Sequence, residues 1–223
     1  MTARDTQHRP LRRDAVRNHQ LVMEAAREVL SEYGTDASME LIASRAGVGV
    51  GTVYRRFPNK EALVDEIAGE MLAELVIEAR RALTLPGGTG LEAFLRVVGR
   101  VLSEHRGYAD KLMGQSKAAC VEQLRDLTAE LLVQAQESGR IKAGITLGDV
   151  MTLAWGLRGV VETSGKVAPE AWQRHMDIHL AGMRSPGPIS EHPPVTREQL
   201  NLVDGHKRRG TGGTGGAAGT TGS

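Results

Sequence analysis

The sequence is poor in cysteine and in aromatic residues: Cys120 is its single cysteine, and Phe, Trp and Tyr together make up 3% of the chain. One cysteine excludes an internal disulfide and a zinc site built from several cysteines. A β-sandwich or barrel usually contains more aromatic and β-branched residues. No apolar run approaches the ~18 residues of a membrane span, and residues 1–14 lack the apolar core of a secretory signal. We therefore expect a cytoplasmic protein without a membrane segment.

What the chain has instead is Ala, Leu, Glu and Arg, which favour helices. Of its 223 residues, 40% are hydrophobic and 25% are charged. These values are typical of soluble globular proteins, and the length suits one or two domains. We predict an all-α fold. Apolar residues at three- and four-residue spacing predict helices over 14–33, 38–46, 50–56, 60–83, 91–105, 117–138, 147–164 and 169–183.

Both ends of the chain lack this helical pattern. Residues 1–13 are basic and contain Pro10, which interrupts a helix, so we predict a disordered basic arm there. Residues 186–223 are rich in Pro, Gly and Thr, and we predict a disordered tail that adds little to stability. Between the ends, a row of glutamates at four-residue spacing predicts a solvated acidic face: Glu66, Glu70, Glu74 and Glu78.

The charges are unevenly distributed along the chain. The net charge is +1 overall, yet residues 1–60 carry an excess of basic side chains and residues 61–185 an excess of acidic ones. Between positions 45 and 60 there are four cations and no acid: Arg45, Arg55, Arg56 and Lys60. Such a cluster is typical of a contact with a polyanion, and a solvated helix face explains it equally well.

The helices predicted over 38–46 and 50–56 are joined by a tight glycine turn, which is the helix-turn-helix pattern. Ser38 can cap the first helix, Ala43 is small where the two helices cross, and Gly47 supplies the turn conformation. The residues that we assign to the structure of this motif are Ser38, Ala43, Gly47, Val48, Val53 and Phe57. A hydroxyl, a phenol and three cations point outward, and these groups suit phosphate oxygens and base edges: Thr52, Tyr54, Arg55, Arg56 and Lys60.

Residues 40–63, ELIASRAGVGVGTVYRRFPNKEAL, resemble the DNA-binding signature of the TetR/AcrR family of bacterial transcriptional regulators. With the preceding helix, the resemblance covers residues 14–65. It implies DNA-backbone contacts by Thr52, Tyr54 and Lys60. Val50, Gly51 and Arg55 fall on the helix that faces the major groove. Arg45 and Arg56 complete the predicted DNA-binding set. Two positions depart from the usual pattern: Gly49 replaces a Ser or Thr cap, and Arg56 replaces a histidine or another aromatic residue.

The resemblance also implies the rest of the architecture. Residues 14–61 would form the helix-turn-helix domain, and residues 62–185 an all-helical domain for ligand binding and dimerisation. We expect a ligand-responsive repressor that binds a palindromic operator in double-stranded DNA as a homodimer. Helices 147–164 and 169–183 carry many apolar residues and are our choice for the dimer interface.

The effector implied by the family would be a largely apolar small molecule in a cavity between helices. The residues that we choose for this site are His105, Tyr108, Cys120, Met151, Trp155 and Arg158. A filled core with these polar residues at its rim explains the same pattern. Arg158 suits a carboxylate or a carbonyl group of the ligand.

Other chemistry finds little support in the sequence. Gly49-Val-Gly51 lacks the remaining residues of a phosphate-binding loop, and His175 and His179 lack the glutamate of a zincin motif. No catalytic Ser/His/Asp arrangement is present, so we predict no enzyme activity, no cofactor and no metal. The alternative is a helical small-molecule-binding or enzymatic bundle whose N-terminal hairpin is only structural.

Overall fold

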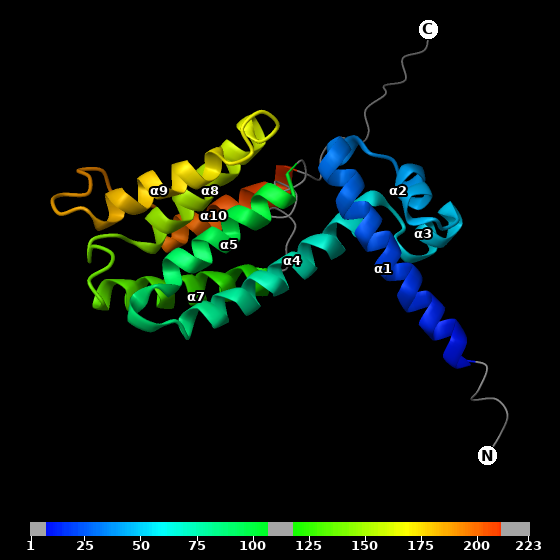
Figure 1. Ribbon diagram of the computed structural model, residues 1–223, viewed down its shortest axis with the longest axis horizontal. Helices are drawn as coiled ribbons and strands as arrows, with labels where there is room; N and C mark the ends of the chain where they lie inside the picture. Colours follow the sequence, from blue (N-terminus) through cyan, green and yellow to red (C-terminus); the bar gives the residue numbers. More distant parts are fainter. Residues whose placement is uncertain (1–7, 107–117, 211–223) are drawn as a thin grey trace, which may run out of the picture.

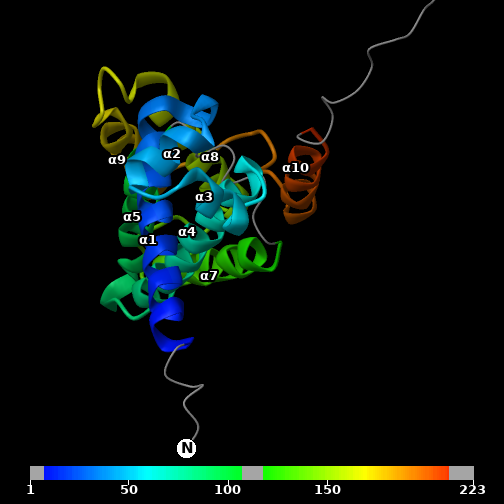
Figure 2. The same ribbon diagram turned by 90° about the vertical axis from the view of Figure 1, so that its right-hand side faces the viewer.

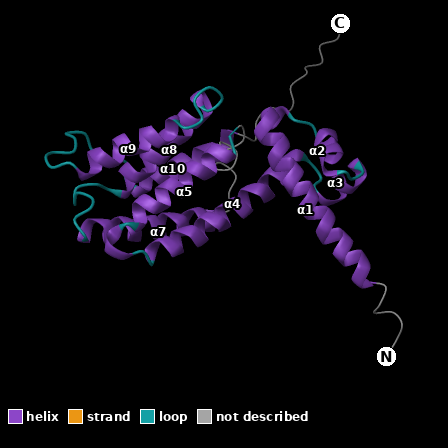
Figure 3. Ribbon diagram, in the orientation of Figure 1, coloured by secondary structure: helices purple, strands orange, loops and turns teal. Residues whose placement is uncertain are grey.

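The computed structural model describes residues 8–106 and 118–210, and all of its regular elements are helices (Figure 3). The predicted all-α fold is confirmed for these residues. At one end of the molecule lie α1 (His8–Tyr33), α2 (Met39–Ala46) and α3 (Val50–Arg56), with the short 3-10 helix η1 (Gly34–Asp36) between α1 and α2. Figure 1 shows that this group forms a domain of its own, separate from the larger bundle.

The long helix α4 (Lys60–Leu83) leaves this domain and runs along the bundle (Figure 1). It packs on α5 (Gly90–Glu104) and α7 (Ala118–Glu137), and η2 (Pro86–Gly88) turns the chain from α4 into α5. The helices α8 (Leu147–Ser164) and α9 (Ala171–Arg184) pack on each other and on α5. The largest fully buried side chains of the bundle include Leu131, Leu157, Met176 and Leu180. One helix, α4, is therefore shared by both halves of the molecule.

The predicted arm is wrong for residues 8–13, because α1 begins at His8. Pro10 lies in the first turn of this helix, where its missing N–H would have no intrahelical acceptor and its fixed φ suits the helix. Residues 1–7 lie outside the described residues. Proline thus belongs to the start of α1 and does not interrupt it.

The predicted disorder of the C-terminal tail is wrong for residues 197–210, which form α10 (Arg197–Gly210). Leu200 is fully buried, and α10 packs on α8. Figure 2 shows α9 and α10 on opposite sides of the bundle. Residues 211–223 lie outside the described residues. The burial of Leu200 and the polar contacts with α7 hold α10 in place, and neither can be read from the composition of the tail.

The acidic row on α4 is solvated only in part: Glu70 and Glu74 are exposed, whereas Glu66 and Glu78 are half-buried. Glu66 accepts a hydrogen bond from Arg56 at 3.1 Å and lies 3.3 Å from His19, and Glu70 pairs with Arg27 of α1. Further along α4, Glu78 pairs with Arg81 at 2.7 Å. The first two glutamates therefore tie α4 to the N-terminal domain by ion pairs.

Candidate DNA-binding surface and internal cavity

The turn between α2 and α3 is fixed by local hydrogen bonds. The Ser38 hydroxyl accepts a hydrogen bond from the backbone N–H of Leu41 at 3.1 Å, which caps α2. Gly47 has a φ of 66°, a left-handed conformation that suits glycine, and its N–H bonds to the carbonyls at the end of α2. Val48 then donates to the Ala43 carbonyl at 3.1 Å. The bonds of Gly47 and Val48 set the direction in which α3 leaves the turn.

The inner face of the motif packs on α1. Ile42 and Val53 are fully buried, Ala43 and Phe57 are nearly so, and Val48 packs partly buried against the same core. The ring of Phe57 stacks near the His19 ring of α1, with 6.0 Å between centroids. Ser38 caps the start of α2, and the other residues assigned to the structure of the motif lie at the turn or in this core. The opposite face of α3 is left for solvent.

That outer face carries several of the predicted DNA contacts. The side chains of Val50 and Tyr54 are 39% and 44% exposed, and nothing lies within 4 Å of a Cβ placed at Gly51. Arg55 donates to the Thr52 hydroxyl at 3.0 Å and to the Gly51 carbonyl at 3.3 Å. Among the described residues, no carboxylate forms an ion pair with Arg55. Its guanidinium is therefore placed on α3 with its charge uncompensated.

Tyr54 lies beside an acid at the edge of this face. Its hydroxyl donates to Glu40 Oε1 at 3.4 Å. Desolvation of the phenol, followed by the negative charge of Glu40, raises the pKa of Tyr54. The phenol therefore stays protonated at neutral pH and can donate a hydrogen bond.

The remaining predicted cations make contacts inside the protein. Arg45 reaches Glu32 at 3.1 Å and Glu28 at 3.4 Å on α1, and the hydrogen bond to Glu32 is the main cause of its raised pKa. Arg56 bonds to Glu66, as described above. Lys60 donates to the carbonyls of Thr35 and Ala37, the latter at 3.3 Å. These three cations brace the N-terminal domain in this structure, whereas Arg55 does not.

A cavity of about 80 Å³ lies inside the bundle, between α4, α5, α7 and α8. Apolar side chains make up most of its wall, and the full set is Ala68, Met71, Leu72, Leu75, Phe94, Leu95, Val98, Val101, Leu102, Val121, Leu124, Arg125, Thr128, Val150, Met151, Ala154, Trp155 and Arg158. Three of the predicted ligand residues, Met151, Trp155 and Arg158, are brought together there by α8. The cavity is therefore lined both by α4, which leads to the DNA-binding domain, and by α8, which carries the predicted ligand residues.

The other predicted ligand residues do not line this cavity. His105 ends α5 beside α1, where burial and then the charge of Arg27 lower the pKa of its imidazole. Cys120 is half-buried on α7 but is not part of the wall, and Tyr108 lies outside the described residues. The predicted positions of His105 and Cys120 are therefore corrected: a helical pattern does not tell which of four packed helices a residue faces.

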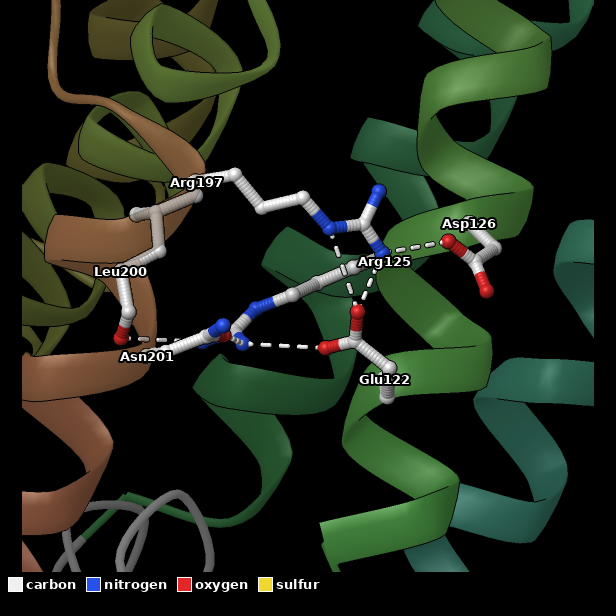
Figure 4. A network of polar contacts seen from close by, with 6 residues as sticks. All are labelled: Glu122, Arg125, Asp126, Arg197, Leu200 and Asn201. Carbon is white, nitrogen blue, oxygen red and sulfur yellow. Dashed lines mark hydrogen bonds and ion pairs between the residues drawn. The ribbon is translucent and has the colours of Figure 1, made fainter.

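The sequence reasoning missed Arg125 and Thr128, both buried on α7, and the α4 side of the wall. A usable signal is the spacing of Val121, Leu124, Arg125 and Thr128, which places them on one face of a helix. Arg125 is held by α10 (Figure 4): it donates to Asn201 Oδ1 at 2.7 Å and to the Leu200 carbonyl at 3.2 Å. Arg197 of α10 pairs in turn with Glu122 and Asp126 of α7.

Most of the large apolar side chains of α8 and α9 are buried within the single chain. Leu153, Leu157, Val161, Trp172, Met176, Leu180 and Met183 are buried in the core of this single chain. Their abundance is therefore no evidence for a dimer interface, contrary to our interpretation of the sequence. The outward side of α9 does carry Ile178, which is largely exposed, whereas the His175 ring lies against Gly156 of α8 with its Nε2 covered.

Comparison with known proteins identifies the family. Residues 22–67 match the family model of bacterial regulatory proteins of the tetR family, and residues 86–185 match that of the SbtR-like transcriptional regulator C-terminal domain. The crystal structure of the TetR regulator SCO0520 from Streptomyces coelicolor has 30% sequence identity and a TM-score of 0.57, and the alignment covers 75% of this chain and 99% of that one. The chain belongs to the TetR family of transcriptional regulators.

Two further relatives agree with this assignment. The TetR regulator from Mycobacterium vanbaalenii has 30% identity and a TM-score of 0.57, over 79% of this chain and 100% of that one. The HTH-type regulator YhgD of Bacillus subtilis is 42% identical over 64 residues, 28% of this chain and 34% of YhgD. The chain thus matches about a third of that curated relative. TetR-family proteins are transcription factors and not enzymes, so the enzymatic alternative is set aside.

Two remaining findings concern membranes and metals. In the described part of the chain, no helix has the length and hydropathy needed to cross a bilayer. The same residues contain no group of three or more His, Cys, Asp or Glu side chains placed to hold a metal ion.

Proposed function

We propose that this TetR-family regulator is a ligand-responsive repressor that binds an inverted-repeat operator as a homodimer. The observation that carries the proposal is the pairing of an exposed, charge-bearing face on α3 with an internal apolar cavity, both connected to α4. A repressor of this kind needs a surface that reads DNA and a separate site whose occupancy favours a different conformation.

The α3 face supports contact with a major groove. Gly51 leaves space for a close approach to DNA, and Val50 offers an apolar surface that suits a thymine methyl group. Arg55 supplies a guanidinium that can bond to a guanine edge, while Thr52 and Tyr54 supply hydroxyl groups for phosphate oxygens. Lys60, Arg56 and Arg45 reach phosphates only if they exchange their present partners for them.

The homodimer is proposed through the outer faces of α8 and α9. The helix α9 lies on the side of the bundle away from α10 (Figure 2), and its residue Ile178 supplies exposed apolar surface there. Two copies related by two-fold symmetry would present their α3 helices to successive major grooves, about 34–36 Å apart or a multiple of that distance. The operator would therefore be an inverted repeat.

The effector is proposed to occupy the cavity, against Met151, Trp155 and Arg158. On α4, Met71 and Leu72 line this cavity, while Glu66 and Glu70 are bonded to the DNA-binding domain. A ligand that moves α4 would therefore act on the position of α3. It must bind the DNA-incompetent conformation more tightly, since equal affinity for both conformations shifts no equilibrium.

The operator can be found without knowledge of the regulated gene. We would select binding sites for the full chain from a pool of random duplexes and map the protection on the selected DNA. The expected result is a two-fold symmetric site bound by two chains, with an affinity that falls steeply as salt rises, because bound phosphates release counterions. A selected site without symmetry, bound by one chain, would contradict the homodimer. Failure to select any sequence would contradict operator recognition.

A further inference from the structure

The two arginines in the cavity wall have different environments. Arg125 comes from α7 and Arg158 from α8, and almost all of the other lining side chains are apolar. A cation beside an apolar space is costly unless acceptors surround it. The acceptors available to each guanidinium therefore show which of the two is prepared for a ligand.

The guanidinium of Arg125 is already engaged within the protein (Figure 4). Its Nη1 donates to Asn201 at 2.7 Å and lies 3.3 Å from Glu122 Oε2, and its Nη2 donates to the carbonyl of Leu200. An amide oxygen, a carboxylate and a backbone carbonyl thus surround it. Arg125 fastens α10 to the bundle, and both of its Nη atoms have acceptors supplied by the chain, while its Nε is covered from solvent as that of Arg158 is.

Arg158 has a weaker set of contacts. Its Nε is completely covered from solvent and makes no hydrogen bond to any described residue, although the side chain as a whole keeps 23% of its exposure. Its ion-pair partner is Glu162, whose Oε1 lies 3.7 Å from Nε, beyond hydrogen-bond distance, on a side chain that is partly exposed. A covered charged donor at a cavity wall is therefore left without a bonded acceptor.

We propose that the effector is an amphipathic acid whose carboxylate binds Arg158 and whose apolar body fills the cavity. The proposal rests on the proposed function, which makes this cavity the effector site. A carboxylate matches the planar fork of a guanidinium and supplies the missing acceptor. The body must be slim, because the volume of about 80 Å³ is far below the ~300–1,000 Å³ of sites for drug-sized ligands. A single alkyl chain meets both conditions.

The test compares two probes of equal length, octanoate and 1-octanol, on the full chain. Calorimetry gives both dissociation constants, and fluorescence of Trp155 reports occupancy of the cavity, with Trp155→Phe identifying the responding residue. We expect octanoate to bind about tenfold or more tightly than octanol, as a charged hydrogen bond predicts. Arg158→Met keeps the apolar stem and should bring the two affinities together by weakening octanoate alone.

Two further arginine variants make the result specific. Arg100→Gln alters an exposed arginine of α5 outside the cavity wall and should keep the wild-type preference for the acid. Arg125→Gln should lower the melting temperature by loosening α10 and also keep that preference. If Arg125→Gln abolishes the preference and Arg158→Met retains it, the carboxylate binds Arg125 and the proposal is overturned. Arg158→Gln replaces Arg158→Met if the latter does not fold.

The affinities of the wild-type protein for the two probes also test the ligand class. Equal affinities for octanoate and octanol would overturn the acid while leaving an apolar effector cavity, and absence of octanoate binding would overturn the proposal. A release experiment with the selected operator DNA tests the effector role of the cavity separately from the ligand class. If octanoate binds with the expected preference but does not release that DNA, the ligand class stands and the effector role of the cavity fails.

Discussion

The N-terminal domain and the regulatory bundle differ in how their interiors are filled. In the first, Ile42, Val53 and Phe57 pack with little or no exposed surface, whereas the second retains a cavity of about 80 Å³ beside Leu72 and Trp155. A domain that reads DNA must hold its side chains in one arrangement, and close packing achieves this. A domain that responds to a ligand needs space and a second arrangement. The two interiors fit these two tasks.

Arg158 of the bundle differs from the arginines that pair between helices in either region. In the N-terminal domain, Arg45 and Arg56 bond to glutamates of other helices. In the bundle, Arg158 has a loose pair with Glu162 on its own helix. Arg45 and Arg56 therefore add contacts between helices, as Arg197 does in the bundle, and Arg158 does not.

The largest expected effect compares core truncations in the two regions. Phe57→Ala should lower the free energy of unfolding by about 3–5 kcal/mol, because it opens a new void in a filled core. Leu72→Ala should cost about 2–3 kcal/mol, since it widens an existing cavity whose wall is already incompletely packed. Urea denaturation followed by circular dichroism measures both. A cost for Leu72→Ala equal to or above that for Phe57→Ala would contradict the difference in packing.

The next effect concerns α10. Deleting residues 197–223 should lower the free energy of unfolding by about 2 kcal/mol, because Leu200 loses its burial and Arg125 loses two acceptors. This replaces the expectation from composition that the tail adds little to stability. Deleting only residues 211–223 is the matched control and leaves α10 whole. Equal melting temperatures of the two truncated chains would show that α10 contributes nothing.

The sequence predicts the N-terminal domain better than the bundle, and the reason is the range of the interactions. Ser38 and Gly47 could be placed because a helix cap and a glycine turn are set by neighbours a few residues away. Helix α10 could not, because its docking depends on Arg125, 76 residues before Asn201. The partners of Lys60 also lie on a distant segment, 23 and 25 residues earlier.

The prediction of the cavity wall from the sequence is limited in the same way. Met151 and Trp155 were predicted from one apolar helix with polar residues, and they do line the wall. The contributions of α4 and of Arg125 were not predicted, and His105 was placed wrongly. A cavity is the space that remains after four helices have packed, so the pattern of any single helix says little about its position.

A smaller effect distinguishes the roles of Arg55 and Lys60 in DNA binding. Arg55→Ala should relax the preference for one base pair by about 1–3 kcal/mol, because its guanidinium faces outward and no described carboxylate pairs with it. Lys60→Ala should weaken binding to the selected operator and to random DNA by similar factors, since a phosphate contact carries no sequence information. Fluorescence anisotropy with both duplexes measures the ratio. Equal losses on both duplexes for Arg55→Ala would place Arg55 on the DNA backbone.

The smallest effect concerns the ion pair between Arg45 and Glu32, which is exposed and strongly screened. The hydrogen bond from Arg45 lowers the pKa of Glu32 below its ordinary value of 4.5, with a further contribution from Tyr33. A carboxyl group whose pKa is lower in the folded state stabilises the fold above the unfolded value, and this contribution is lost as pH falls through the folded pKa. The stabilisation is therefore complete at neutral pH and disappears below about pH 4.5.

Arg45→Gln removes the main cause of that shift, so the pKa of Glu32 should rise toward 4.5, as measured by an NMR titration of its side-chain carboxyl carbon. The stability difference between wild type and variant should shrink as the solution is acidified from neutral pH. Arg55→Gln is the matched control, because it makes the same substitution in the same domain at a cation that no glutamate pairs with. An unchanged Glu32 titration in Arg45→Gln would mean that this arginine is solvated, and its charge would then be as available to DNA as that of Arg55.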